Sequence, residues 1–96
     1  MTMVASAAAA TTTNTRARAL SLYRQLLRSA MKMPTPNRQQ YVIRKTRQEY
    51  RANRHVTDEH EIDFLIRLAD TNLDTVLVQA EHLTALFKEN AKNADL

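Results

Sequence analysis

The chain has 96 residues, with 14 Lys or Arg against 10 Asp or Glu for a formal net charge of +4, and it contains no Gly and no Cys. Without glycine it lacks the residue that phosphate loops and dinucleotide turns require, and without cysteine it can form no disulfide, thiolate metal site or self-held iron–sulfur cluster. A chain of this length makes one small domain that buries only about 60% of its unfolded surface, which favours an adaptor whose core a partner completes over an enzyme.

The positive and negative charges lie in different halves of the sequence. Residues 1–54 hold eleven Lys or Arg and one acidic residue, a balance of +10, whereas residues 55–96 hold three and nine, a balance of −6. The total of +4 therefore conceals a strong charge asymmetry.

The first fifteen residues, MTMVASAAAATTTNT, are low in complexity and carry no charged side chain. This composition predicts a disordered tail or a targeting segment, since no acidic residue occurs before Glu49. No stretch approaches the roughly 18 to 20 apolar residues that cross a bilayer, so we expect no transmembrane segment. The folded domain is predicted to cover residues 16–96.

Apolar residues at spacings of three and four predict a first helix from Arg16 to about Met33. Pro34 disfavours helical geometry in the residue before it, and Thr35 followed by Pro36 is typical of an N-cap and the first position of a new helix. The apolar face of the first helix is predicted to contain Leu20, Tyr23, Leu26, Leu27, Ala30 and Met31.

A second helix is predicted to run from Pro36 to about Arg54, and a third to begin after an N-cap at Thr57. Apolar residues recur along the third helix for seven turns up to Phe87. No strand alternation competes with these patterns, and both connections are short, so sequential helices are expected to be antiparallel neighbours. The predicted fold class is all-α, an antiparallel up-down-up three-helix bundle with a disordered N-terminal tail.

The sequence offers little for catalysis or metal binding. The three histidines, His55, His60 and His82, share no ligand spacing. Ser21 and Ser29 lie in no nucleophile elbow. We therefore predict no catalytic residue, no metal ligand and no enzymatic activity.

A continuous basic stripe is the most informative feature of the second helix. Arg44, Arg47, Arg51 and Arg54 recur at spacings of three and four, with Arg38 and Lys45 nearby. Because like charges at these spacings repel each other, an acidic surface is expected to offset them. Three candidates are an acidic stripe on the third helix, an acidic protein and nucleic-acid phosphates, although the few aromatic residues disfavour nucleic acid. The acidic stripe would contain Glu59, Asp63, Asp70 and Asp74.

The tripeptide Leu22-Tyr23-Arg24 and the downstream pattern Tyr41-x-x-Arg44-x-x-Arg47-x-x-Tyr50-Arg51-x-Asn53-Arg54 resemble the LYR (complex 1 LYR) family of small mitochondrial proteins. The resemblance covers residues 16 to about 87. It implies a three-helix bundle in the mitochondrial matrix that binds the acidic, acylated mitochondrial acyl carrier protein. The acyl-4′-phosphopantetheine is then supplied in trans, and the chain has no cofactor of its own.

The same resemblance also implies a client, which is the protein or protein complex that the adaptor assists. The sequence is most similar to the family member associated with respiratory complex I, which implies assistance with the assembly or activity of that complex. It is also similar to the family's iron–sulfur assembly member, so an adaptor for a cysteine desulfurase is an alternative. A small basic RNA-binding or ribosome-associated protein is an alternative from another class, and DNA is not an expected partner.

By resemblance, the site residues fall into two groups. The residues expected to meet the acyl carrier protein are Arg16, Leu22, Tyr23, Arg24, Arg44, Arg47, Arg51 and Arg54. The residues expected to line the acyl channel are Leu26, Leu27, Tyr50, Leu73, Val76 and Leu77. Tyr50 stands where the family usually has phenylalanine, and its hydroxyl needs a partner if it is buried.

Overall fold

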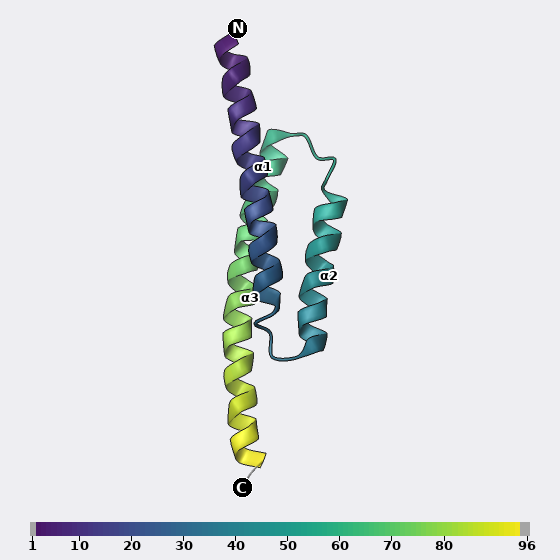
Figure 1. The fold of residues 1–96 in the computed structure, drawn as a ribbon, viewed down its shortest axis with the longest axis vertical. Coiled ribbons are helices and arrows are strands. Elements are labelled where there is room, and N and C mark those ends of the chain that lie inside the picture. The colour runs from purple at the N-terminus through teal and green to yellow at the C-terminus, as the bar shows by residue number, and fades with distance from the viewer. Residues whose placement is uncertain (1, 95–96) are drawn as a thin grey trace.

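The computed structural model describes residues 2–94, with side chains described for residues 14–91. It contains three helices, α1 (Thr2–Ala30), α2 (Pro36–Ala52) and α3 (Glu59–Ala94), which alternate in direction (Figure 1). The predicted all-α, three-helix architecture is confirmed. The two ends of the chain point in opposite directions, because α1 and α3 each extend past the part that packs with α2 (Figure 1).

Helix α1 begins at Thr2, whereas the sequence predicted a helix from Arg16 and a disordered tail before it. Alanine has the highest intrinsic helix propensity, so the alanine-rich composition favours continuation of the helix in this segment. A targeting role for residues 1–15, and their separation from the folded domain, stay predictions.

Helix α1 ends at Ala30, three residues before the predicted position. The backbone N–H groups of Met31, Lys32 and Met33 donate to carbonyls three residues earlier, at 3.1, 3.0 and 3.1 Å. Such bonds tighten the last turn before Pro34 and satisfy carbonyls that the helix leaves without partners.

The connection into α2 matches the predicted capping. The Thr35 hydroxyl accepts a hydrogen bond from the backbone N–H of Arg38 at 3.3 Å, and Pro36 occupies the first turn. The Gln39 side chain donates to the carbonyl of Met33 at 3.0 Å. The start of α2 is therefore fixed to the end of α1 by short-range polar contacts.

The connection between α2 and α3 differs slightly from the prediction. Helix α2 ends at Ala52 rather than Arg54. The backbone and side-chain amides of Asn53 still donate to the Glu49 carbonyl, at 3.1 and 2.9 Å, but the backbone N–H of Arg54 donates to the carbonyl three residues earlier, that of Arg51, at 3.4 Å. Helix α3 begins at Glu59, and the carbonyl of Asp58 accepts its first helical bond, from Ile62, at 2.9 Å. Asp58 therefore takes the N-cap position predicted for Thr57.

The core lies along α1 in two clusters of buried apolar residues. One contains Leu22, Leu26, Ile66 and Leu73, and the other contains Ala30, Met33, Val42 and Ala80. The predicted apolar face of α1 was partly wrong, since Leu20 and Met31 are 46% and 60% exposed while Leu22 is buried. Helix α1 packs between two neighbours, so its buried face centres on Leu22 and Leu26.

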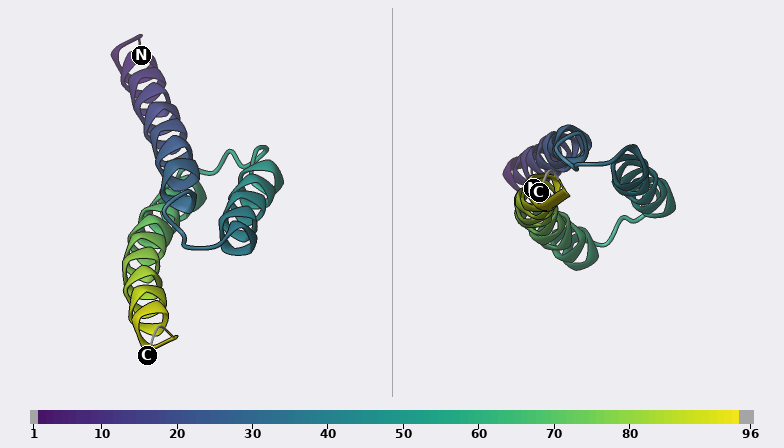
Figure 2. Two further views of the ribbon diagram at one scale, coloured as in Figure 1. Left: turned by 60° about the horizontal axis from the view of Figure 1, so that its bottom comes forward. Right: turned by 90° about the horizontal axis from the view of Figure 1, so that it is seen from below.

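Helix α1 packs along both other helices, but α2 and α3 make few contacts with each other. Viewed from one end of the bundle, α2 stands apart from α3, and the two are joined through α1 and the connecting segments (Figure 2). The side chains of the three helices leave a groove at this position.

Candidate partner-binding site

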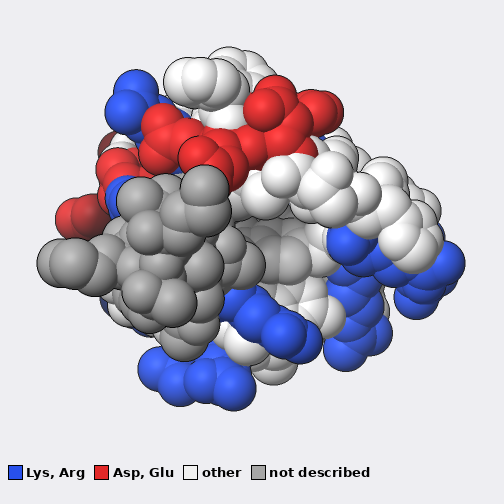
Figure 3. Space-filling model, turned by 90° about the horizontal axis from the view of Figure 1, so that it is seen from above, with Lys and Arg blue, Asp and Glu red and all other residues white. Residues whose placement is uncertain are grey.

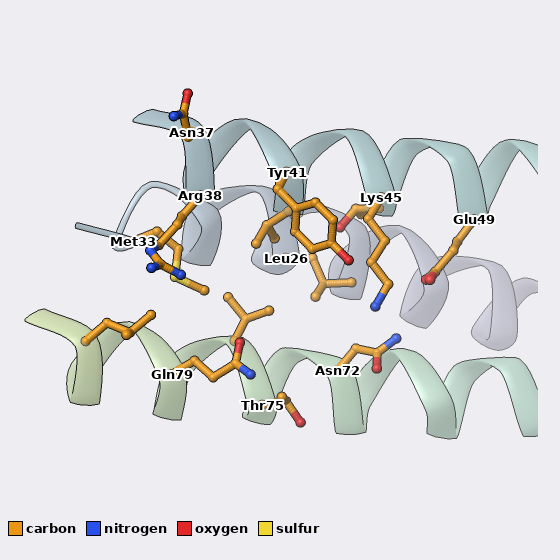
Figure 4. A pocket seen from close by; sticks show the side chains of 14 residues that line it. Leu26, Met33, Asn37, Arg38, Tyr41, Lys45, Glu49, Asn72, Thr75 and Gln79 are labelled. Carbon is orange, nitrogen blue, oxygen red and sulfur yellow. The ribbon is translucent and has the colours of Figure 1, made fainter. Parts of the chain in front are cut away.

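A groove of about 400 Å³ lies between α2 and α3, with α1 beneath it (Figure 4). This volume is within the usual range for small-ligand sites, about 300 to 1,000 Å³. The residues that line the groove are Leu26, Met33, Asn37, Arg38, Tyr41, Val42, Lys45, Thr46, Glu49, Asn72, Thr75, Val76, Gln79 and Leu83.

The groove is apolar at its base and polar at its rim. Leu26 and Val42 are buried, and Val76 is half-buried beside them. On the rim, Tyr41 and Lys45 extend from α2 toward α3 (Figure 4). This arrangement suits an extended apolar chain, which would cover the base without burying the rim cations.

The groove has two different ends. At one end Arg38 and Met33 lie close together (Figure 4). The Arg38 guanidinium carbon is 6.0 Å from the centre of the Phe87 ring. This distance is near the limit of a cation–π contact. Toward the other end lie Glu49 on α2 and Asn72 on α3.

The structure brings two of the six predicted acyl-channel residues to this groove, Leu26 and Val76. Leu73 is buried in the core with Leu22 and Ile66, and Leu27 is half-buried on α1. Leu77 lines a shallower depression of about 500 Å³ beside Ala80 and Thr84.

The polar α3 residues of the groove, Asn72, Thr75 and Gln79, were not predicted. They follow one another at helical spacing, and this spacing is the sequence signal that could have placed them on one face.

Tyr50, the sixth predicted channel residue, packs between α1 and α2 instead of lining the groove. Its hydroxyl donates to the backbone carbonyl of Ala19 at 2.8 Å, so the hydroxyl has the partner that the sequence required. Its ring lies 4.7 Å from that of Tyr23, with 50° between the planes. Burial is the main cause that raises the pKa of the Tyr50 hydroxyl, and Tyr23 and Glu49 add smaller contributions.

The residues predicted to meet the carrier are mostly accessible. Arg16 and Arg24 are exposed on α1, and Arg44, Arg47 and Arg51 are exposed on α2. Arg54 follows α2 and its Nε donates to His55 Nε2 at 3.0 Å. Tyr23 is half-buried and Leu22 is 5% exposed, so Leu22 serves the core rather than a protein surface.

The cations of α2 divide between two faces. Arg38 and Lys45 line the groove, whereas Arg44, Arg47 and Arg51 lie outside it. The sequence grouped these residues as one basic region, but their helical positions separate them.

Within residues 14–91, the acidic stripe of α3 makes no ion pair with α2. Asp63 instead pairs with Arg67, four residues later on α3, at 3.0 Å. Both of these side chains are more than half exposed. From one end of the molecule, acidic side chains gather on one side, apart from the larger basic areas (Figure 3). The described contacts therefore do not support neutralisation of the basic stripe by α3.

The described residues also bear on metal binding and on membrane insertion. Histidine and carboxylate side chains form no group of three or more there that could hold a metal ion. No described helix is long and apolar enough to cross a membrane.

The chain is similar to several proteins named LYR motif-containing protein 4 or a homolog of it. The chain is 36% identical over 88 residues to LYR motif-containing protein 4 homolog of Drosophila melanogaster, covering 83% of this chain and 96% of the relative. It is 35% identical over 75 residues to LYR motif-containing protein 4 of Taeniopygia guttata, covering 76% and 84%. These relatives do not bear out the predicted similarity to the complex I member, LYR motif-containing protein 2.

The family described as Complex 1 protein (LYR family) matches residues 17–75. Its members are mitochondrial, non-catalytic adaptors that generally carry no cofactor of their own. The match covers more than half of the chain and includes the tripeptide, the basic stripe and most of the groove. This chain therefore belongs to the LYR family.

Proposed function

We propose that this chain is a mitochondrial matrix adaptor that holds an acylated acyl carrier protein and joins it to a cysteine desulfurase of iron–sulfur cluster assembly. The observation that carries the carrier part is the groove between α2 and α3, whose base is apolar and whose rim is polar. The client part is supported by the similarity to relatives named LYR motif-containing protein 4, the family's iron–sulfur assembly member.

The groove gives the acyl chain a binding surface that the small domain does not fill by itself. Leu26, Val42 and Val76 offer apolar contacts along it. Each buried methylene contributes about 0.8 kcal/mol, so an acyl chain of about ten carbons offers several kcal/mol before the ordering costs of binding. The chain would complete a core that 96 residues leave incomplete.

The outer face of α2 supplies the contact to the carrier itself. Arg44, Arg47 and Arg51 are exposed there and have no acidic partner among the ion pairs of residues 14–91. A guanidinium group can bind a carboxylate or a phosphate through two parallel hydrogen bonds. An acidic protein surface would therefore meet these arginines while its acyl group enters the groove on the other face of α2.

Affinity purification of the full chain from mitochondria tests this proposal. The lysate is kept at about 150 mM salt, where weak surface attractions are screened, and every retained species is identified by intact mass. We expect a carrier protein bearing an acyl chain together with a cysteine desulfurase.

Recovery of complex I intermediates without the desulfurase would contradict the proposed client and support the complex I alternative. Recovery of RNA or ribosomal proteins without the carrier would contradict the proposal as a whole.

A further inference from the structure

At one end of the groove Arg38, which lines it, approaches Phe87 of α3, which lies just outside the lining. Arg38 lies in the first turn of α2 and its guanidinium carbon is 6.0 Å from the centre of the Phe87 ring. Met33, which is buried, and Leu83 line the groove beside this contact. Residues from the α1–α2 connection, α2 and α3 thus converge at one point.

The opposite end of the groove lies near the predicted carrier surface. Glu49 lines that end and is followed in sequence by Tyr50, whose ring packs against Tyr23 of the LYR tripeptide. Arg51 lies one residue further along α2. A chain that enters near the tripeptide therefore travels along α2 from Glu49 toward Arg38. These two residues are eleven positions apart, about 16 Å along a helix.

We propose that Arg38 and Phe87 form the end wall of the groove and set the longest acyl chain that the adaptor holds. This inference rests on the proposed function, because it assumes that an acyl chain occupies the groove. A methyl terminus that passed this wall would have to displace the Phe87 ring and remove water from the Arg38 guanidinium without giving it a new partner. Removing water from an unpaired cation is costly, so longer chains are disfavoured.

The test offers the full-length adaptor an equimolar mixture of carrier proteins loaded with octanoyl, decanoyl, dodecanoyl, tetradecanoyl or hexadecanoyl chains. Native mass spectrometry then measures which lengths are retained. Phe87→Ala should move the upper limit to longer chains. Each added methylene that becomes buried is worth about fourfold in affinity, so the chain two carbons longer should gain on the order of tenfold relative to the wild type.

Phe64→Ala is the matched control, because Phe64 is also an exposed phenylalanine of α3 but lies 23 residues before Phe87, about 35 Å away along the helix. Its length profile should equal that of the wild type. Phe87 is 40% exposed, so its replacement should leave the fold intact.

A second variant tests the same wall from the opposite direction. Gln79 is exposed and lines the groove, so Gln79→Trp should fill part of the space before the wall and move the profile to shorter chains. Opposite shifts in the two variants would support the end wall. An unchanged length profile in Phe87→Ala, with the acylated carrier still bound, would overturn the end wall and leave the proposed carrier function standing. Failure of the wild type to prefer any acylated carrier over the unacylated form would overturn both the wall and the proposed carrier function.

Discussion

The two sides of α3 that face the other helices differ in how closely they pack. Toward α1, Ile66 and Leu73 are buried against Leu22 and Leu26, and the two helices are in contact along this seam. Toward α2, the contacts are few and a groove of about 400 Å³ separates the helices. One helix therefore supplies both a closed interface and an open one.

The difference follows from the residues on each side. The side of α3 that lines the groove includes Asn72 and Gln79, whose side-chain amides would lose water if α2 moved against them. Burying such polar groups without hydrogen-bond partners costs free energy. The seam with α1 has no such obstacle, since its residues are apolar. Polar side chains on one side of α3 therefore help to keep the groove open.

The largest expected effect is on the closed seam. Leu73→Ala should lower the free energy of unfolding by about 3 kcal/mol, because it removes buried methylenes and leaves a cavity. Val78→Ala, at a position that is 66% exposed on the same helix, should change it by less than about 0.5 kcal/mol. Urea unfolding followed by circular dichroism measures both. Equal losses in the two variants would contradict the assignment of the core to this seam.

The fold was largely predictable because it depends on local signals. Pro34, the Thr35 cap and the recurrence of Ile62, Ile66 and Leu73 are each readable from neighbouring residues. The groove was not predictable in this way. The spacing on α2 and α3 marks their faces but does not show how far apart the two helices stand. That separation depends on packing through α1.

The candidate site shows the same division. The spacing of Arg44, Arg47 and Arg51 predicted one basic face on α2, and the structure places these exposed side chains outside the groove. That this face binds a carrier stays a prediction. The sequence could not show that Leu22 is buried while Leu20 is exposed, because α1 has apolar residues around much of its circumference and the choice of face depends on two neighbours. Nor could it find the Ala19 carbonyl as the partner of Tyr50, since these residues lie 31 positions apart.

Binding of an acyl chain in the groove should stabilise the folded adaptor. At a free acylated-carrier concentration of about 100 times Kd, the free energy of unfolding should rise by about 2.7 kcal/mol. The carrier without an acyl chain should raise it less at the same concentration, because the groove stays empty. Thermal unfolding of the adaptor with each form measures the difference. Equal stabilisation by both forms would show that the groove takes no part in binding.

Charge reversal on the outer face of α2 tests how much this face contributes to carrier binding, apart from the groove. Arg47→Glu combined with Arg51→Glu should weaken carrier binding more than about tenfold, because like charges would then meet across the interface. Both residues are exposed, so the helix content should not change. Calorimetric titration with the acylated carrier at about 150 mM salt measures the loss.

The control variant carries the same change in charge at another place. Arg28→Glu combined with Lys32→Glu alters exposed residues in the last turn of α1 and just after it, away from the outer face of α2. It should retain most of the affinity. A similar loss in both double variants would indicate that the overall positive charge, rather than the stripe, attracts the carrier.

The smallest effect is expected at the contact between α1 and α2. Tyr50→Phe removes the hydrogen bond to the Ala19 carbonyl and keeps the ring against Tyr23, so it should cost about 1 kcal/mol. Tyr41→Phe is the matched control, because Tyr41 is 63% exposed. Its effect on the free energy of unfolding should be smaller. A loss in Tyr41→Phe as large as that in Tyr50→Phe would contradict a specific role for the Ala19 bond.

The same hydroxyl makes stability depend on alkaline pH. Burial raises the pKa of Tyr50 in the folded state above its ordinary value of 10.0. The unfolded chain therefore loses this proton at a lower pH than the folded chain, and the free energy of unfolding falls as the pH rises from about 10 through the folded-state pKa. Unfolding measured between about pH 9 and 11 should show a shallower decline for Tyr50→Phe than for the wild type. Parallel declines would mean that the Tyr50 hydroxyl ionises alike in both states, contrary to the pKa expected from its burial.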